Sequence, residues 1–502
     1  MPKRLSPSTL HGICLSFIAK NIDHWTGHYE EYHLGQANYL HVLGPFNELN
    51  SQLAQDVMNV LIKEQRLSRS CLHLLLFGRA LQHLDLSSCN RIVNDEVAGI
   101  IASSCKVLHK LDLTNCKRVT SAGFHAIATS LQYLSTLYVT KTNLRSSAAH
   151  IIFKNCTELQ DVSMKHCQIS DQDLMVLCQE VASSKRGTKL KRLDVSYTLV
   201  TEMGVRAILK NIPQLQVVDY PSLINCLFDE DIENIESLIN SPECYKYKLR
   251  SLQCQDFISV SNEMLQAIPT ICPQVTQLDL RFAGGFDNSG LCHLAKMHNL
   301  KDLQLCCEES EDITFEDGVM PVLIEIGPDL KVLSLQDISG LDPVVICQLC
   351  PNLQKLFLLM MKNGKVFNTL GDINNNHPAM TELVELDFWC RNGDDSLSEE
   401  ALSFILSRSV NVESIGLIRV DSFTTNVLQT ILRHNKFTCL KRLSLHECHC
   451  MTEDGLSDLL LSSYNQLQFV KLINCLQITR RNYEGWERVA KRDNLNIKID
   501  WK

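Results

Sequence analysis

The sequence predicts an α/β solenoid of about fifteen repeats, in which parallel strands line a concave face and helices cover the convex face. Three observations predict it. A Leu-x-x-Leu-x-Leu pattern recurs along most of the chain, its polar residues alternate with the apolar ones as in a half-buried strand, and the segments between patterns have helical spacing. The first residue of each pattern, which we call the anchor, falls at Leu81, Leu108, Leu134, Leu159, Leu190, Leu215, Leu249, Val275, Leu300, Leu330, Leu353, Leu383, Val412, Leu440 and Leu467.

The spacing of the anchors identifies the class of solenoid. The fourteen intervals between Leu81 and Leu467 span 386 residues and average about 27.6 residues, which lies within the range of about 20–29 for leucine-rich repeats. Each repeat of such a protein buries its apolar face against its neighbours, so 502 residues can share one continuous core. We therefore expect a horseshoe of leucine-rich repeats.

The first repeat shows how strand and helix follow from the residues. Leu84 and Leu86 alternate with polar neighbours and predict a strand. The segment 94–104 has apolar residues at helical spacing, and Asn94 stands where its side chain can cap the first turn. A strand followed by a helix in every repeat produces a parallel sheet on one face.

The chain divides into two predicted parts. Residues 1–70 lack the repeat and have helical patterns, whereas residues 71–502 form the repeat domain. Residues 495–501 (LNIKIDW) read as a last strand that closes the solenoid. Inserts are expected where intervals are long, including the acidic segment 308–317 and the segment 362–377.

Composition limits the kinds of partner. The 48 basic and 57 acidic residues give a net charge of −9, which argues against nonspecific binding to nucleic acid or anionic membranes and leaves room only for a local basic patch. No segment has 18 uninterrupted apolar residues, and the N-terminal apolar stretch 13–19 is too short to span a bilayer. We expect a soluble protein.

The 22 cysteines predict a reducing compartment. Many stand at fixed positions of the repeat, where a cysteine serves as a small buried apolar residue. Such abundant free thiols are typical of the cytoplasm or nucleus. The cysteines on these repeat positions are Cys89, Cys105, Cys116, Cys156, Cys167, Cys272, Cys350, Cys448 and Cys475.

Two short motifs stand out before the repeats. Leu10, Cys14 and Ile18 recur at i, i+4 and i+8 and so share one face of a predicted helix that starts after Pro7-Ser8. About thirty residues later comes the segment 43–53, a proline followed by leucines, with Pro45, Leu49 and Leu53 as its key positions.

The first motif resembles the BC box, Ser/Thr-Leu-x-x-x-Cys-x-x-x-aliphatic, of von Hippel-Lindau-type receptors. The resemblance implies that Leu10, Cys14 and Ile18 bind elongin C within the elongin B/C adaptor. The second motif resembles the box that contacts a cullin, which implies that role for Pro45, Leu49 and Leu53; it departs from the pattern at Gly44 and by one extra residue before Leu49. The order of motifs is similar to that of the zyg-type receptors. Those carry an armadillo-like domain, which we do not expect in these 502 residues.

The repeats themselves resemble the cysteine-containing class found in F-box receptors. Together these resemblances imply a non-catalytic substrate receptor of a cullin-RING ubiquitin ligase, which recruits a target protein for ubiquitination and degradation. One alternative is a leucine-rich-repeat scaffold whose N-terminal helices only cap the first repeat. Another is an F-box-like receptor that uses the region from Leu43 to Leu61.

A target is expected on the concave face. There the polar positions of early repeats give way to apolar ones at Phe357, Leu359, Trp389 and Ile418, and exposed aromatic residues on a strand commonly mark protein-binding patches. Arg281 is added as a charged residue of the kind that binds strongly at interfaces. A cover formed by the 362–377 insert is the alternative.

No motif for catalysis is found. The sequence has no glycine-rich phosphate loop, no GxSxG and no HExxH. The run 446–450 (HECHC) contains residue types that bind metals, but Cys448 holds a buried repeat position. We therefore expect no enzyme activity, no cofactor and no metal site.

Overall fold

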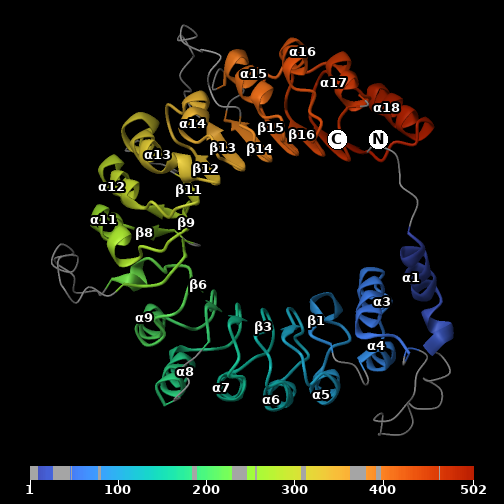
Figure 1. Ribbon diagram of the computed structural model, residues 1–502, viewed down its shortest axis with the longest axis vertical. Coiled ribbons are helices and arrows are strands. Elements are labelled where there is room, and N and C mark those ends of the chain that lie inside the picture. Colours follow the sequence, from blue (N-terminus) through green and yellow to red (C-terminus); the bar gives the residue numbers. More distant parts are fainter. Residues whose placement is uncertain are drawn as a thin grey trace. The chain divides into compact units, whose positions relative to one another are not determined.

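Two parallel sheets follow one another along the chain (Figure 1). The computed structural model describes residues 9–26, 46, 48–76, 81–183, 189–228, 246–254, 257–306, 313–361, 380–391, 397–462 and 464–502. The strands of the first sheet are β1 His83–Asp85, β2 Lys110–Asp112, β3 Thr136–Tyr138, β4 Asp161–Ser163, β5 Arg192–Asp194 and β6 Val217–Asp219. Those of the second are β7 Ser251–Gln253, β9 Gln277–Leu280, β11 Asp302–Cys306, β12 Val332–Gln336, β13 Lys355–Met361, β14 Glu385–Cys390, β15 Ser414–Ile418, β16 Arg442–His446, β17 Phe469–Ile473 and β18 Lys498–Trp501.

The predicted repeat is confirmed strand by strand. Each of the fifteen anchors lies two residues before the first residue of a strand, from Leu81 before β1 to Leu467 before β17. Every neighbouring pair of strands within a sheet is parallel, so that His83 lies beside Lys110 and Arg442 beside Phe469. The register shifts between β13 and β14, after Leu358. The chain is a leucine-rich-repeat solenoid. The expected closing strand is β18, which pairs with β17.

Helices cover one face of the strands, and we call the face opposite the helices the concave face (Figure 1). Most begin at a polar cap, and Asn94 is one as predicted, since its side chain accepts a hydrogen bond of 3.2 Å from the amide of Val97. The repeat helices are α5 Asp95–Ser104, α6 Ser121–Ser130, α7 Ser146–Asn155, α8 Asp171–Ser183, α9 Glu202–Asn211, α11 Asn262–Ile271, α12 Asn288–Cys292, α13 Met320–Ile326, α14 Pro343–Leu349, α15 Glu399–Arg408, α16 Thr425–His434, α17 Glu453–Leu460 and α18 Arg480–Arg492. A short pair, β8 Ile258–Ser259 and β10 Ala283–Gly284, lies outside the main sheets.

The core lies between strands and helices and contains the predicted cysteines. All nine cysteines on the repeat positions are buried. Burial raises the pKa of Cys105, Cys116 and Cys448 to about 12, so these thiols stay protonated at neutral pH. Their role is packing together with weak S–H donation, as from Cys448 to the carbonyl of Leu417.

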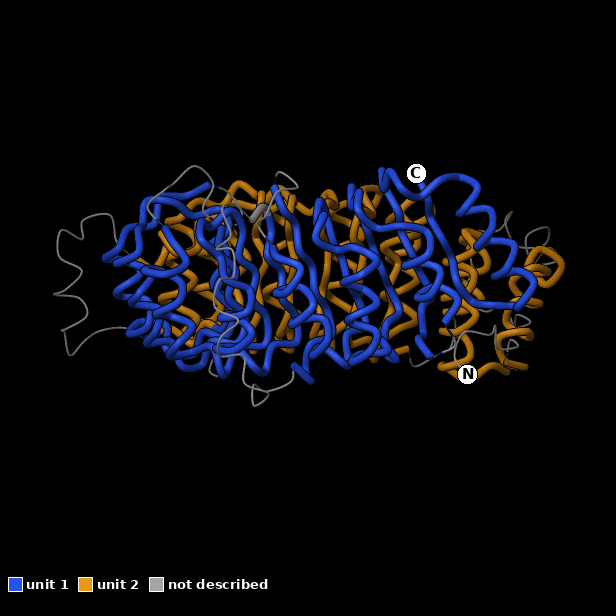
Figure 2. Tube along the Cα trace, turned by 90° about the horizontal axis from the view of Figure 1, so that it is seen from above, with its two compact units in different colours: residues 1–6, 231–246, 250–502 blue, residues 7–230, 247–249 orange. Residues whose placement is uncertain are grey.

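Among the described residues before the repeats lie the helices α1 Leu10–Lys20, α3 Ser51–Lys63 and α4 Arg69–Leu76. The chain divides into two compact units, shown in Figure 2. Residues 7–230 and 247–249 form unit 2, which therefore contains these helices and the first sheet, and unit 1 contains the second sheet. The boundary at residue 70 stays a prediction. None of the described helices is both long and apolar enough to cross a lipid bilayer.

Candidate protein-binding surfaces

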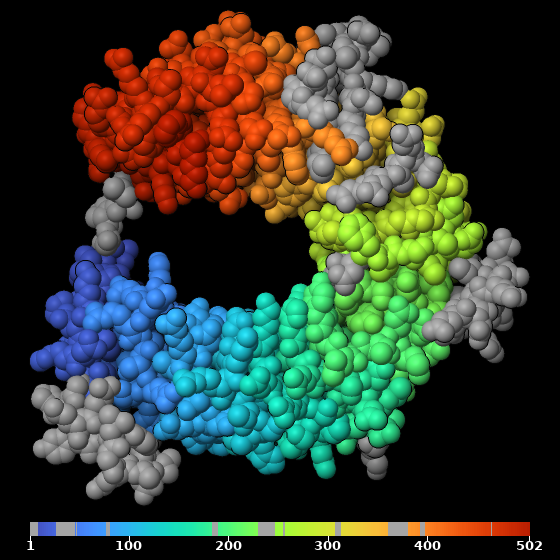
Figure 3. Space-filling view, turned by 180° about the vertical axis from the view of Figure 1, so that it is seen from behind, coloured from blue at the N-terminus to red at the C-terminus, as the bar shows by residue number. Residues whose placement is uncertain are grey.

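Helix α1 presents an apolar stripe to solvent. Leu10, Ile13 and Phe17 are 77%, 54% and 61% exposed, and Cys14 is also exposed. These residues stand at i, i+3, i+4 and i+7, which places them on one face of the helix. Ile18, the third residue of the predicted motif, is half-buried at the border of this face. We call Leu10, Ile13, Cys14 and Phe17 the α1 stripe; helix α1 belongs to the dark-blue part of the chain in Figure 3.

The opposite face of α1 holds the helix in place. Ala19 of α1 and Ile22, which follows the helix, are buried, and α1 contacts α3. The guanidinium of Arg66 donates hydrogen bonds to the carbonyl of Lys20 at 2.7 Å and to the carboxylate of Asp23 at 2.8 Å. The helix begins at Thr9, whose hydroxyl accepts a hydrogen bond from the amide of Gly12. The α1 stripe is therefore presented on an anchored helix.

Helix α4 covers the first repeat. Its residues from Cys71 to Leu76 are buried, α4 contacts α5, and Arg69 donates a hydrogen bond of 2.9 Å to the carbonyl of Ile92. Helix α3 contacts α4, and α1 contacts α3. Helices α4 and α3 thus cover the first repeat, which is the role that the scaffold alternative gives to the N-terminal helices. The α1 stripe takes no part in that cover.

The second predicted motif lies at the start of α3. Leu49 precedes the helix and Leu53 occupies its first turn, where its amide donates a hydrogen bond of 2.8 Å to the side chain of Asn50. Both leucines are half-buried. Pro45 lies outside the described residues. Buried Ala54, Val57, Met58 and Leu61 form the face that α3 turns toward its neighbours.

The predicted apolar positions of unit 1 lie on its concave face. Phe357, Leu359, Trp389 and Ile418 are half-buried and alternate with fully buried residues such as Leu358. Trp389 lies beside Ile418 in the parallel register, and that row continues through His446 to Ile473. This row therefore crosses β14 to β17, and Phe357 and Leu359 lie on the neighbouring strand β13, whose register with β14 shifts after Leu358. The 362–377 insert lies outside the described residues, so the predicted cover stays untested.

Arg281 does not belong to this group of apolar residues. It follows β9, and strands β11 and β12 stand between β9 and β13. Its guanidinium donates hydrogen bonds of 3.0 and 2.7 Å to the two carboxylate oxygens of Asp279. Sequence spacing could not show this pairing, because both residues were read only as polar positions of one strand.

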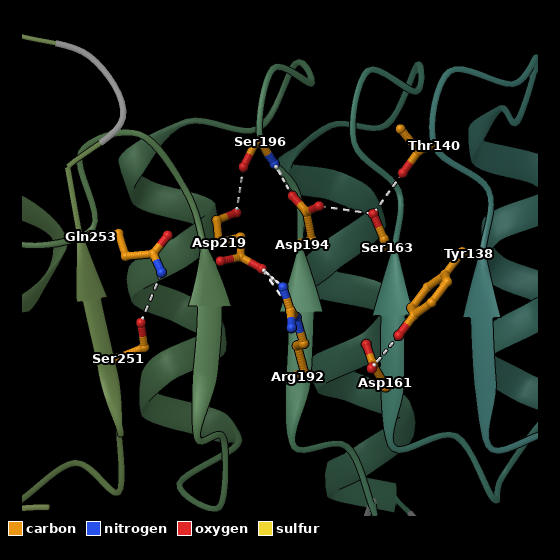
Figure 4. A network of polar contacts seen from close by, with 10 residues as sticks. All are labelled: Tyr138, Thr140, Asp161, Ser163, Arg192, Asp194, Ser196, Asp219, Ser251 and Gln253. Atoms are coloured by element: carbon orange, nitrogen blue, oxygen red, sulfur yellow. Dashed lines mark hydrogen bonds and ion pairs between the residues drawn. The ribbon is translucent and has the colours of Figure 1, made fainter. Parts of the chain in front are cut away.

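The concave face of unit 2 carries a polar network between strands (Figure 4). The Tyr138 hydroxyl donates to Asp161 at 2.7 Å, and the Ser163 hydroxyl donates to Asp194 at 2.8 Å. Burial, followed by the hydrogen bond to Asp161, raises the pKa of Tyr138 to about 12. The contacts join neighbouring repeats, which makes a structural role the simplest explanation of these aspartates.

At the end of this network lies a partly buried ion pair (Figure 4). Arg192 donates hydrogen bonds of 3.2 and 2.8 Å to one carboxylate oxygen of Asp219. Burial nevertheless raises the pKa of Asp219, an effect that Arg192 opposes. Aspartates of several strands also accept hydrogen bonds from backbone amides two residues later, a turn-forming role that this residue type commonly has; they include Asp85, Asp112, Asp194 and Asp279.

The run 446–450 lies at the end of β16 and has no arrangement for a metal ion. Cys448 is buried, whereas Cys450 is exposed. The ring of His446 is 3.0 Å from the hydroxyl of Ser444. Among the residues that the structure describes, no group of three or more His, Cys, Asp or Glu side chains could hold a metal.

Comparison with known proteins places the chain near leucine-rich-repeat proteins. No protein-family model matches it. It is 28% identical to the F-box/LRR-repeat protein 4 of Bos taurus over 28% of this chain and 22% of that protein. It is 31% identical to the Coronatine-insensitive protein homolog 1a of Oryza sativa over 76% of this chain and 62% of that protein.

The chain thus spans at most about three fifths of the length of these curated relatives. Among solved structures, the yeast complex of Rad7 and Elc1 has a chain that aligns over 95% of this chain and 96% of its own length. The identity is 15% and the TM-score 0.45.

Proposed function

We propose that the protein is a substrate receptor of a cullin-RING ubiquitin ligase, and that the α1 stripe binds the elongin B/C adaptor. The observation that carries this proposal is the exposure of Leu10 and Cys14 on a helix anchored by its other face. A stripe of this kind costs solubility in an isolated chain, so a partner surface is its physical justification. Two features add support: the BC-box resemblance of the same residues, and the F-box/LRR character of a curated relative.

The receptor does no covalent chemistry in this proposal. It holds a target protein close to the ligase and so raises the effective concentration of the target's lysines. The apolar patch of Phe357, Leu359, Trp389 and Ile418 is the proposed target surface. Leu49 and Leu53, which stand at the start of α3, are the described residues proposed to contact the cullin.

Size-exclusion chromatography after co-expression with elongins B and C tests this function. We expect the wild-type chain to co-elute with both elongins and the variant Leu10→Ser/Cys14→Phe to lose them. Serine removes the apolar side chain of Leu10, and the larger phenylalanine keeps the adaptor from approaching α1 closely at position 14. The matched control is Leu199→Ser/Met203→Ser. It removes two side chains of unit 2 that are 68% and 67% exposed but lie outside α1, and it should still co-elute.

Two outcomes would overturn the proposal. If the wild-type chain elutes without elongins, it does not bind the adaptor. If both double variants lose the elongins equally, the loss follows from any change of exposed apolar residues and is not specific to the α1 stripe. The F-box-like alternative rests on the F-box/LRR name of the relative. It would be favoured if the chain co-eluted with the F-box adaptor instead, and if changes in α1 had no effect on that complex.

A further inference from the structure

A row of cations runs along the edge of unit 2 where the first four strands pass into their loops. The loops 87–94, 114–120, 140–145 and 164–169 contain six basic residues and no acidic ones. This is a local excess in a chain whose net charge is −9. We call the six residues the basic edge; they are Arg91, Lys117, Arg118, Lys141, Arg145 and Lys165.

The loops of the basic edge lie side by side in fixed positions. The amide of Asn115 donates to the carbonyl of Thr140 at 2.8 Å, and the amide of Lys141 donates to the carbonyl of Lys165 at 2.9 Å. Asn115 and Lys141 both have a φ near +60°, so each loop makes the same turn at the same point. The cations are therefore brought into a row by the backbone.

Five of the six cations are free to meet a partner, whereas Lys165 is half-buried and its ammonium lies 5.1 Å from the centre of the Tyr197 ring. Arg91, Lys117, Arg118, Lys141 and Arg145 are exposed. Among the described residues, no carboxylate lies within ion-pair distance of any member of the basic edge, whereas Arg192 of the same unit pairs with Asp219. The carboxylates nearby hold other hydrogen bonds. Asp112 accepts one from the amide of Thr114, and Asp95 accepts two from the amide and the hydroxyl of Thr120.

A pocket opens at one end of the basic edge. It has a volume of about 570 Å³ and is lined by Asn90, Arg91, Asn115, Lys117 and Arg118. The guanidinium of Arg118 is oriented by a hydrogen bond of 2.9 Å to the carbonyl of Arg91, which occupies only one of its five donors. Three cationic residues and two asparagines line this one pocket, a set of residues that suits a doubly charged oxyanion better than a single carboxylate.

We propose that the basic edge binds a phosphorylated, acidic segment of the target protein, with the phosphoryl group in this pocket and carboxylates along Lys141, Arg145 and Lys165. Neighbouring strands are about 4.8 Å apart, so the four loops of the basic edge span roughly 14 Å, the length of about four extended residues. The overall negative charge disfavours a long nucleic acid. The proposal rests on the proposed function, because it names the chemistry of the target.

Fluorescence polarisation on the full chain tests it. The probe is a fluorescein-labelled ten-residue peptide with one phosphoserine followed by four glutamates. We expect saturable binding that weakens by at least about tenfold in Lys117→Glu/Arg118→Glu, since charge-assisted hydrogen bonds are lost. The matched control, Lys106→Glu/Lys154→Glu, reverses two exposed lysines of the same unit outside the basic edge and should bind as wild type does.

Other outcomes overturn the proposal. They are the absence of saturable binding, equal weakening in both variants, equal affinity for the unphosphorylated peptide, and tighter binding of a ten-nucleotide single-stranded RNA. Co-elution with elongins is measured on the same variants. If Lys117→Glu/Arg118→Glu keeps the elongins, the fold is intact, so a failure of the basic edge is separate from a failure of the adaptor role.

Discussion

Replacing Asn435 by alanine is expected to lower the free energy of unfolding of the surrounding repeats by about 3 kcal/mol. The side chain is 3% exposed and joins two repeats. Its amide group donates to the carbonyls of Leu406 at 2.8 Å and Ser409 at 2.9 Å, while its oxygen accepts from the amide of Phe437 at 2.9 Å. Alanine removes the side-chain partner of two buried backbone groups, the carbonyl of Leu406 and the amide of Phe437, whereas the carbonyl of Ser409 keeps a hydrogen bond of 3.4 Å from the amide of Val412. Each buried group that loses its partner costs about 1–3 kcal/mol if water cannot reach it.

Asn411 provides the matched control for this measurement. It also donates to the carbonyl of an earlier repeat, Thr381, at 2.8 Å, but it is exposed. Water can replace that bond, so Asn411→Ala should cost less than about 1 kcal/mol. Urea denaturation followed by circular dichroism measures both variants, and equal losses would show that burial of Asn435 does not determine its contribution.

The second large effect is expected at Phe17. Phe17→Gln should weaken the binding of elongin B/C by about 2–4 kcal/mol, the usual cost of removing a central aromatic residue from an interface. Glutamine is a good helix former, and Phe17 is 61% exposed, so the stability of the free chain should change little. Isothermal titration calorimetry with the purified adaptor measures the affinity.

His11 is the control on the same helix. Its ring lies 3.5 Å from the carboxylate of Asp56 on α3, so it faces away from the α1 stripe. His11→Gln should leave the affinity for elongin B/C within about twofold of wild type. A loss at His11 as large as that at Phe17 would mean that the helix as a whole, rather than its stripe, determines binding.

The repeat architecture could be predicted because one physical pattern determines it. An apolar residue must face the core at every second position of each strand, so the anchors stand at a constant distance of two residues before the strands. The helix cap at Asn94 could also be predicted from the sequence, since it depends only on local hydrogen bonding. Strand length was not: β13 extends from Lys355 to Met361, whereas β1 has three residues.

The candidate sites were less predictable, because they depend on how helices and loops that are distant in the sequence pack against one another. The motif at Leu10 and Cys14 gave the helix, but only the packing of α3 and α4 shows that it need not cap the first repeat. Ile13 and Phe17 were missed, although their spacing from Leu10 was a usable signal. The basic edge was missed because its cations come from four distant loops that align only in the folded solenoid.

The most direct measurement of the central claim is the alkylation of Cys14 by N-ethylmaleimide, with and without saturating elongin B/C, followed by peptide mass spectrometry. Cys14 lies within the α1 stripe and is exposed, and exposed Cys450 of unit 1 serves as the internal control. We predict that the adaptor slows the reaction of Cys14 by at least about tenfold and leaves Cys450 unchanged. Unaltered reaction of Cys14 in the presence of bound adaptor would contradict the proposed role of α1.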